Sequence, residues 1–193
     1  MVHRTGWTPR KDTDMTSPDR VSPAKFAHIV LKTKNYEAMV SWWCDFLGAH
    51  VRHGNEFISF LSYDEEHHRI AIARIPTLED RDPRSVGVEH FAFTYSTLDD
   101  LFGQFERMKA IDVHPYWTIN HGFTLSAYYR DPDGNQVETQ VDTMTMEEAD
   151  AFMHGPLFAE NPIGRNVDFD ALLARYRAGE PESAITDYAT AGV

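Results

Sequence analysis

The sequence is poor in cysteine and has no long apolar segment. Its single cysteine, Cys44, cannot form a disulfide within the chain, and residues 1–14 lack the apolar core of a secretory signal peptide. No apolar run approaches the roughly 20 residues that a membrane-spanning helix needs. These absences favour a cytoplasmic protein that has no membrane partner.

Basic residues are also scarce. Lysine and arginine total 18 against 30 acidic residues, which leaves a net charge of −12, and no Lys/Arg-rich block interrupts this balance. A surface that follows a phosphate backbone is therefore not expected, and nucleic acid is excluded as a partner. The hydrophobic content of 42% over 193 residues is ordinary for a soluble globular chain with a sizeable core.

The apolar spacing predicts the same order of elements twice: a strand, an amphipathic helix and three strands. The first set comprises a strand over 26–32, a helix from Asn35 to Gly48, and strands over 49–53, 57–62 and 68–75. The second set comprises a strand over 88–95, a helix entered at Ser96 or Thr97, and strands over 113–118, 123–129 and 136–141. A tight hairpin turn is predicted at residues 131–135, where Pro and Gly fit consecutive turn positions.

The two sets are related by a constant offset. His28 and His90, the helix starts Asn35 and Thr97, and Val51 and Val113 are each 62 residues apart. We therefore predict an α+β fold of paired βαβββ modules, whose strands form a curled mixed sheet around a shared cavity. Module one covers 25–76 and module two covers 87–142, within a domain that spans 24–142.

The segments that flank this domain have different characters. Residues 1–23 are polar, contain three prolines and predict a flexible N-terminal arm. Residues 143–193 predict a C-terminal helical extension, because Thr145 and Glu148 have capping-box spacing and Asp168 or Asp170 can cap a second helix that runs to Gly179. After about Pro181 no pattern is strong, and fraying is expected there.

Three residues could form a metal site in this arrangement. His28 and His90 occupy equivalent places in the first strands, and Glu138 lies in the last strand of module two. A single strand histidine is more often an ordinary core or surface residue, and a single strand glutamate usually faces solvent. Together, two imidazoles and one carboxylate are the facial triad that leaves iron with exchangeable positions.

These residues and the repeat resemble the vicinal oxygen chelate superfamily of glyoxalases, fosfomycin-modifying enzymes, bleomycin-binding proteins and type I extradiol dioxygenases. The resemblance covers about residues 25–142, and the segment YRDPDGNQVE (129–138) is typical of the whole superfamily. Position 76, which corresponds to Glu138 in module one, is a proline, and Ala73, Arg74 and Ile75 offer no carboxylate. Because glyoxalase-type sites carry an acid from each module, this absence favours a three-ligand site that admits substrate and dioxygen together.

Further residues resemble the extradiol branch. The segment HHRIAIARIP (67–76) is similar to the pattern in which the second histidine, here His68, is an acid–base residue that is not a metal ligand. Tyr128 matches the tyrosine that hydrogen-bonds the substrate oxygen. Where the family carries a histidine and an aspartate, this sequence has Ile119 and Gly122, so that His121 either replaces those residues or lines the pocket. The resemblance implies a one-domain extradiol dioxygenase that uses Fe²⁺, with Mn²⁺ as the alternative metal, to cleave a catechol such as 2,3-dihydroxybiphenyl with O₂.

Two other functions stay open at this point. One is a metal-dependent enzyme of the same superfamily without oxygenase activity, similar to glyoxalases or fosfomycin transferases; the other is a metal-free module that binds a small cationic molecule. We expect aromatic side chains to wall a catechol pocket, and the candidates are Phe91, Phe93, Tyr116, Trp117 and Phe123. We also expect a homo-oligomer.

Overall fold

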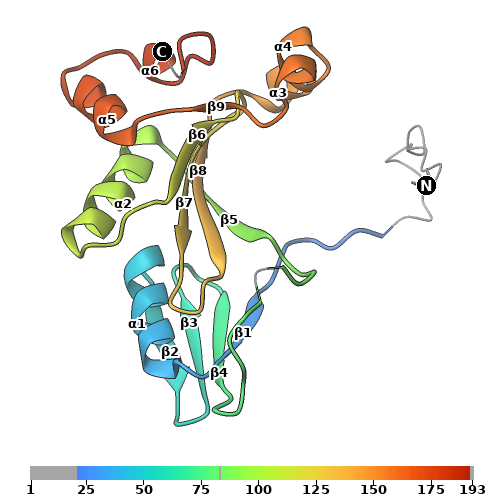
Figure 1. The fold of residues 1–193 in the computed structure, drawn as a ribbon, viewed down its shortest axis with the longest axis vertical. Coiled ribbons are helices and arrows are strands. Elements are labelled where there is room, and N and C mark those ends of the chain that lie inside the picture. Colours follow the sequence, from blue (N-terminus) through green and yellow to red (C-terminus); the bar gives the residue numbers. More distant parts are fainter. Residues whose placement is uncertain (1–20, 83, 192–193) are drawn as a thin grey trace.

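The computed structural model describes residues 21–82 and 84–191. Its elements confirm the α+β class and the paired βαβββ modules (Figure 1). Module one contains β1 (Ile29–Thr33), α1 (Tyr36–Leu47), β2 (His50–Gly54), β3 (Ile58–Ser62) and β4 (Ile70–Arg74). Module two contains β5 (His90–Tyr95), α2 (Leu98–Ala110), β6 (Trp117–Asn120), β7 (Thr124–Arg130) and β8 (Gln136–Asp142).

The strands are divided between two sheets, one for each module. Module one forms a four-stranded sheet in the order β1-β4-β3-β2, and module two contributes four of the five strands of a sheet in the order β5-β8-β7-β6-β9. In each sheet the first strand of the module runs parallel to the last. Helices α1 and α2 lie on the same side of the two sheets, and α3 and α4 lie on the other side, near the end of β6 (Figure 1).

Helix α1 forms because its apolar residues recur on one face. Tyr36, Met39, Trp43 and Phe46 are spaced three or four residues apart, and all four are buried. Gly48 then ends the helix in a left-handed conformation with φ of 63°, which glycine adopts without the steric cost that a Cβ would bring.

The turn between β7 and β8 of module two makes hydrogen bonds to module one. Asp131 Oδ1 accepts hydrogen bonds from the backbone N–H groups of Asp133 and Asn135, which closes the predicted hairpin turn. The other carboxylate oxygen, Oδ2, accepts a hydrogen bond of 3.2 Å from the indole Nε1 of Trp43 on α1. The Asn35 side chain also donates to Asp133 at 2.6 Å. These contacts fix module two against the helix of module one.

Apolar side chains also pack between α1 of module one and the strands of module two. The ring of Phe46 lies 5.1 Å from that of Tyr129 on β7, and the ring of Trp43 lies 6.0 Å from that of Phe93 on β5. Arg107 on α2 donates to the carbonyl groups of Asp45 and Phe46. The two modules therefore share one hydrophobic core.

The C-terminal extension contains α3 (Met146–Met153), α4 (Pro156–Glu160), β9 (Arg165–Asn166), α5 (Phe169–Arg177) and α6 (Glu182–Ile185). Thr145 and Glu148 form the predicted capping box, and Asp168 caps α5 as expected. The expectation of fraying after Pro181 is wrong. The side chains of Ile185 and Tyr188 are 3% and 6% exposed, because apolar residues near the C-terminus pack onto the rest of the extension.

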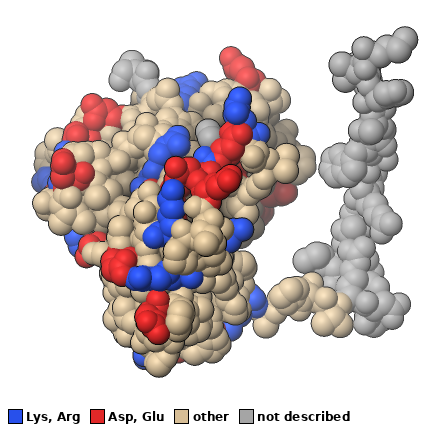
Figure 2. Space-filling model, turned by 60° about the horizontal axis from the view of Figure 1, so that its bottom comes forward, with Lys and Arg blue, Asp and Glu red and all other residues tan. Residues whose placement is uncertain are grey.

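The predicted N-terminal arm, residues 1–23, falls mostly outside the described residues. Within the described part, no helix is both long and apolar enough to cross a bilayer. Figure 2 shows acidic and basic side chains interspersed on the face that it views, without a continuous basic surface there.

Candidate metal and catechol site

Two predicted metal ligands meet on the face of the module-two sheet that points away from α2. The parallel register of β5 and β8 sets Ala92 opposite Glu138, so that His90, two residues before Ala92, projects from the same face. His90 Nε2 lies 3.1 Å from Glu138 Oε2, and the side chain of Glu138 is only 5% exposed. A buried carboxylate is thus joined to an imidazole that remains partly open to solvent.

Tyr128 and His121 lie beside this pair. Tyr128 is opposite Glu138 in the antiparallel register of β7 and β8, and its hydroxyl lies 3.0 Å from His121 Nε2. The other imidazole nitrogen, His121 Nδ1, contacts the carbonyl oxygen of Ile163. Because a carbonyl only accepts hydrogen bonds, Nδ1 carries a proton, and in the neutral ring Nε2 accepts from the Tyr128 hydroxyl.

The environment of Tyr128 keeps its hydroxyl protonated. Burial, followed by the negative charge of Glu138, raises the pKa of Tyr128 well above its usual range. The phenol therefore remains a hydrogen-bond donor at neutral pH.

The aromatic candidates divide between the two faces of the sheet. The ring of Trp117 stacks on Tyr128 with 4.7 Å between centroids, Tyr116 lies 6.3 Å from the same ring, and Phe123 stacks beside His121 at 6.4 Å. Phe91 and Phe93 instead pack against the shared core and line a cleft of about 570 Å³ between the modules. Their assignment to the pocket with His90 is corrected, because alternate residues of a strand point to opposite faces.

The other predicted residues lie together in module one. His28 immediately precedes β1 and is exposed, and its ring centroid lies 4.3 Å from that of His68. Phe60 on β3 contacts His68 edge to face at 4.9 Å. Burial, followed by the nearby imidazoles of His28 and His67, lowers the pKa of His68, which favours the neutral ring.

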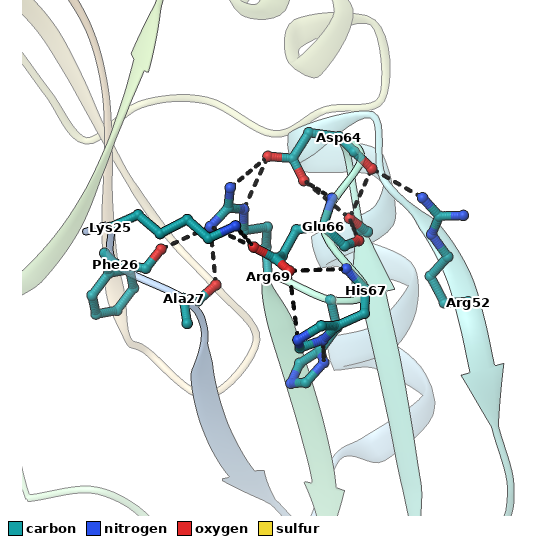
Figure 3. A network of polar contacts seen from close by, with 10 residues as sticks. Lys25, Phe26, Ala27, Arg52, Asp64, Glu66, His67 and Arg69 are labelled. Carbon is teal, nitrogen blue, oxygen red and sulfur yellow. Dashed lines mark hydrogen bonds and ion pairs between the residues drawn. The ribbon is translucent and has the colours of Figure 1, made fainter. Parts of the chain in front are cut away.

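Arg69 binds the backbone of the two residues that precede His28 (Figure 3). Its guanidinium donates to the carbonyl oxygens of Phe26 at 2.7 Å and Ala27 at 3.1 Å. Asp64 accepts from Arg69 at 2.9 Å, and this contact lowers the pKa of the Asp64 carboxyl. Arg69 thus fixes the two residues before His28 while Asp64 fixes Arg69.

The six predicted site residues therefore form two groups within a single chain. His90, Glu138, Tyr128 and His121 form the module-two group, and His28 and His68 form the module-one group. Among residues 21–82 and 84–191, no cluster of three or more His, Cys, Asp or Glu side chains is arranged to hold a metal ion. The expected convergence of His28 with His90 and Glu138 is not found within one chain, and the three-ligand site stays a prediction.

Two positioning contacts were missed from the sequence. Arg69 follows the recognised His67-His68 pair, but nothing local indicates that its partners are backbone carbonyls of another segment. Asn161-Pro162-Ile163-Gly164 has the composition of a turn, and yet no sequence signal places it against His121.

Comparison with known proteins identifies the class to which the fold and the site belong. Residues 25–139 match the family described as the Glyoxalase/Bleomycin resistance protein/Dioxygenase superfamily. The chain belongs to this superfamily.

Two curated relatives and one solved structure are similar to this chain over most of its length. Biphenyl-2,3-diol 1,2-dioxygenase 2 of Rhodococcus globerulus is 46% identical over 171 residues, which cover 86% of this chain and 89% of the relative. Biphenyl-2,3-diol 1,2-dioxygenase 3 of the same organism is 44% identical, with 86% and 90% of the two chains covered. The crystal structure of a glyoxalase/dioxygenase from Nostoc punctiforme superposes with a TM-score of 0.53 at 17% identity, over 67% of this chain and all of the other. That structure supports the fold alone.

Proposed function

We propose that the chain is an extradiol ring-cleaving dioxygenase that acts on a catechol such as biphenyl-2,3-diol. Both atoms of O₂ enter the product, so the reaction needs no external reductant. The observation that carries this proposal is a buried carboxylate, Glu138, that lies beside the imidazole of His90 and the protonated phenol of Tyr128 on one open sheet face. The identity of 46% with a biphenyl-2,3-diol dioxygenase supports the choice of substrate.

The donor chemistry fits a divalent metal. The ion-pair partners of Glu138 among the described residues are imidazoles, His90 Nε2 at 3.1 Å and His121 Nε2 at 4.0 Å, rather than a lysine or an arginine. A buried carboxylate without such a cation is suited to coordinate a metal ion. In the proposal His28, His90 and Glu138 hold Fe²⁺, which when bound supplies one-electron transfer between a catechol and dioxygen.

The remaining residues bind the substrate and move protons. When a catechol binds, Tyr128 Oη turns its single proton from His121 Nε2 to a catechol oxygen, and the stacked ring of Trp117 keeps the phenol in place. His68 takes a proton from the second catechol hydroxyl, because its lowered pKa leaves the ring neutral, and later returns that proton to the product. In the proposal the Nδ1–H group of His68 donates to Nδ1 of His67, 2.6 Å away, which leaves Nε2 of His68 as the atom that takes up the proton.

The first test is an oxygen-uptake assay after anaerobic loading with Fe²⁺. With biphenyl-2,3-diol, we expect O₂ consumption equal to substrate consumption and the appearance of a yellow ring-opened product. His68→Ala should lower kcat at least about tenfold, since general acid–base catalysis contributes about 10²- to 10⁴-fold. The matched control is His114→Ala, because the side chain of His114 is 55% exposed and pairs only with Asp112 among the described residues.

The outcomes separate the proposal from its rivals. A protein that binds Fe²⁺ but consumes no O₂ with any catechol would leave a non-oxygenase enzyme of the superfamily. A protein that binds no metal would favour the metal-free binding module. Equal losses in His68→Ala and His114→Ala would refute the role assigned to His68.

A further inference from the structure

The sheet face that carries Glu138 is polar toward one end. Gln136 on β8 and Arg130 on β7 share this face with Glu138, because side chains alternate along a strand. Gln136 donates to the Glu89 carboxylate at 2.6 Å, and the guanidinium of Arg130 lies 4.5 Å from the ring centroid of Tyr116. An uncharged ring placed here would bury these polar groups away from water, which is unfavourable.

Aromatic side chains lie toward the other end of the face. The hydroxyl of Tyr128, which binds a catechol oxygen in the proposed function, lies 3.0 Å from His121 Nε2. The ring of Phe123 stacks beside the His121 imidazole, with 6.4 Å between centroids. A line of ring systems therefore leads from the phenol that binds the catechol to Phe123.

The side chains on β5 next to Glu138 are short. Ala92 lies opposite Glu138 in the strand register, Thr94 lies opposite Gln140, and both Ala92 and Thr94 are exposed. Gln140 Nε2 donates to the Thr94 hydroxyl at 3.0 Å, so that its amide is paired without a ligand. Short side chains leave space above the strand, which a planar substituent of a catechol bound at Glu138 can occupy.

The C-terminal extension supports Phe123 from behind. Helices α3 and α4 stand on the same side of the sheet as this face (Figure 1), and they carry Phe152 and Phe158. The rings of Phe152 and Phe158 lie 6.4 Å and 6.2 Å from that of Phe123, and 6.0 Å from each other. Gly122 permits this approach, because a Cβ at that position would meet the Phe152 ring at 2.3 Å. We refer to Phe123, Phe152 and Phe158 as the aromatic wall.

The two helices behind the aromatic wall are not part of the paired modules. Both α3 and α4 follow residue 139, where the match to the superfamily ends. A further contact joins the extension to the same place, because the carbonyl oxygen of Ile163 binds His121 Nδ1. The extension thus supports both His121 and Phe123 at the apolar end of the face.

We propose that the aromatic wall binds the second ring of a two-ring catechol and that the C-terminal extension thereby determines which catechols the site prefers. Phe123 contacts the second ring, while Phe152 and Phe158 are positioning residues that hold Phe123 in place. This inference rests on the proposed function, in which Glu138 and Tyr128 fix the position of the first ring.

The experiment compares biphenyl-2,3-diol with catechol, which lacks the second ring. Phe123→Ala and Phe158→Ala should each lower the ratio of kcat/KM for biphenyl-2,3-diol to that for catechol by about five- to tenfold, the size of a lost aromatic contact. The matched control is Leu157→Ala, because Leu157 precedes Phe158 on α4 and is 45% exposed. The control should stay within about twofold of the wild-type ratio.

A ratio of two substrates separates a role in specificity from a structural role. Equal losses with both catechols would show that the substitutions damage the site as a whole, and this result would overturn the inference. An unchanged ratio would place the second ring elsewhere and would also overturn it. Phe158→Leu keeps the test available if the alanine variant does not fold, since it retains apolar volume without the planar ring; it should lower the ratio by about threefold.

Anaerobic calorimetry of the Fe²⁺-loaded protein measures binding without turnover. The wild type should bind biphenyl-2,3-diol at least about tenfold more tightly than catechol, because a second ring is removed from water. Equal affinities would overturn the inference and leave the proposed function in place. The predicted difference in affinity without any O₂ consumption would refute the proposed function and leave the aromatic wall in place.

Discussion

Arg69 offers a quantitative test of how the site is positioned, through the variant Arg69→Ala. The guanidinium donates two charge-assisted hydrogen bonds to the carbonyl groups of Phe26 and Ala27, directly before His28. Its side chain is 19% exposed and is held by Asp64 at 2.9 Å. The substitution removes both bonds and leaves the segment that carries His28 free to move.

The magnitude follows from the number of bonds and their exposure. A hydrogen bond to a charged group contributes about 1.5–3 kcal/mol, and partial exposure of this guanidinium reduces the value for the pair to about 2 kcal/mol. That loss corresponds to about a 30-fold weaker Fe²⁺ affinity, because a factor of ten in affinity is about 1.4 kcal/mol. Residues that orient metal ligands typically change metal affinity by about 10- to 100-fold.

The assay is an anaerobic Fe²⁺ titration against a competing chelator. The matched control is Arg52→Ala, because Arg52 belongs to the same network but donates to the carbonyl of Asp64 and does not contact the residues before His28 (Figure 3). We expect the control to stay within about twofold of the wild type, since the loss of an exposed contact is worth well under 1 kcal/mol. Equal affinities of Arg69→Ala and the wild type would refute the positioning role.

Three further predictions concern the junction, the extension and pH. Trp43→Phe removes the indole N–H that donates to Asp131 and should lower the free energy of unfolding by about 1–3 kcal/mol, because the indole is buried. An unchanged midpoint of unfolding in urea would contradict this. Gly164→Ala should destabilise more than Gly179→Ala, since both have positive φ but only the Cβ at position 164 would meet backbone atoms, those of Asn120 and His121. Equal melting temperatures of the two variants would contradict this. The Asp64 carboxyl has a folded-state pKa below its ordinary value of 3.8, so its contribution to stability should be present above that pH and be lost as the pH falls further. Asp64→Asn should therefore flatten the decline of stability below about pH 4, as measured by urea unfolding.

Local sequence patterns predicted most elements of the two modules. The apolar spacing of α1 and the capping residues Thr145 and Asp168 act over three or four residues, so they could be identified without tertiary information. The start of β6 was misplaced at Val113, whereas the strand begins at Trp117. Pro115 lies between them and has no N–H group to donate to a neighbouring strand.

The module-two group of predicted site residues could also be predicted from the sequence, because strand register determines which of them lie side by side. The parallel and antiparallel pairings of β8 bring His90 and Tyr128 to Glu138, and alternation along each strand selects the shared face. The same alternation separates Phe91 from His90 and could have excluded it from the pocket.

The position of the module-one group relative to the module-two group could not be predicted in this way. It depends on how α1 packs against the β7–β8 turn, through contacts such as Trp43 with Asp131, which are 88 residues apart. The contact of Ile163 with His121 is similarly distant, at 42 residues. Periodicity and capping signals carry no information about such pairs.

The central claim is that the protein inserts both atoms of O₂ into a catechol. Its most direct test is a single turnover with ¹⁸O₂ and biphenyl-2,3-diol after anaerobic Fe²⁺ loading, with the product rapidly quenched and analysed by mass spectrometry. We expect a ring-opened product that contains two labelled oxygen atoms. Unchanged substrate, or an oxidised product without label, would contradict the dioxygenase assignment.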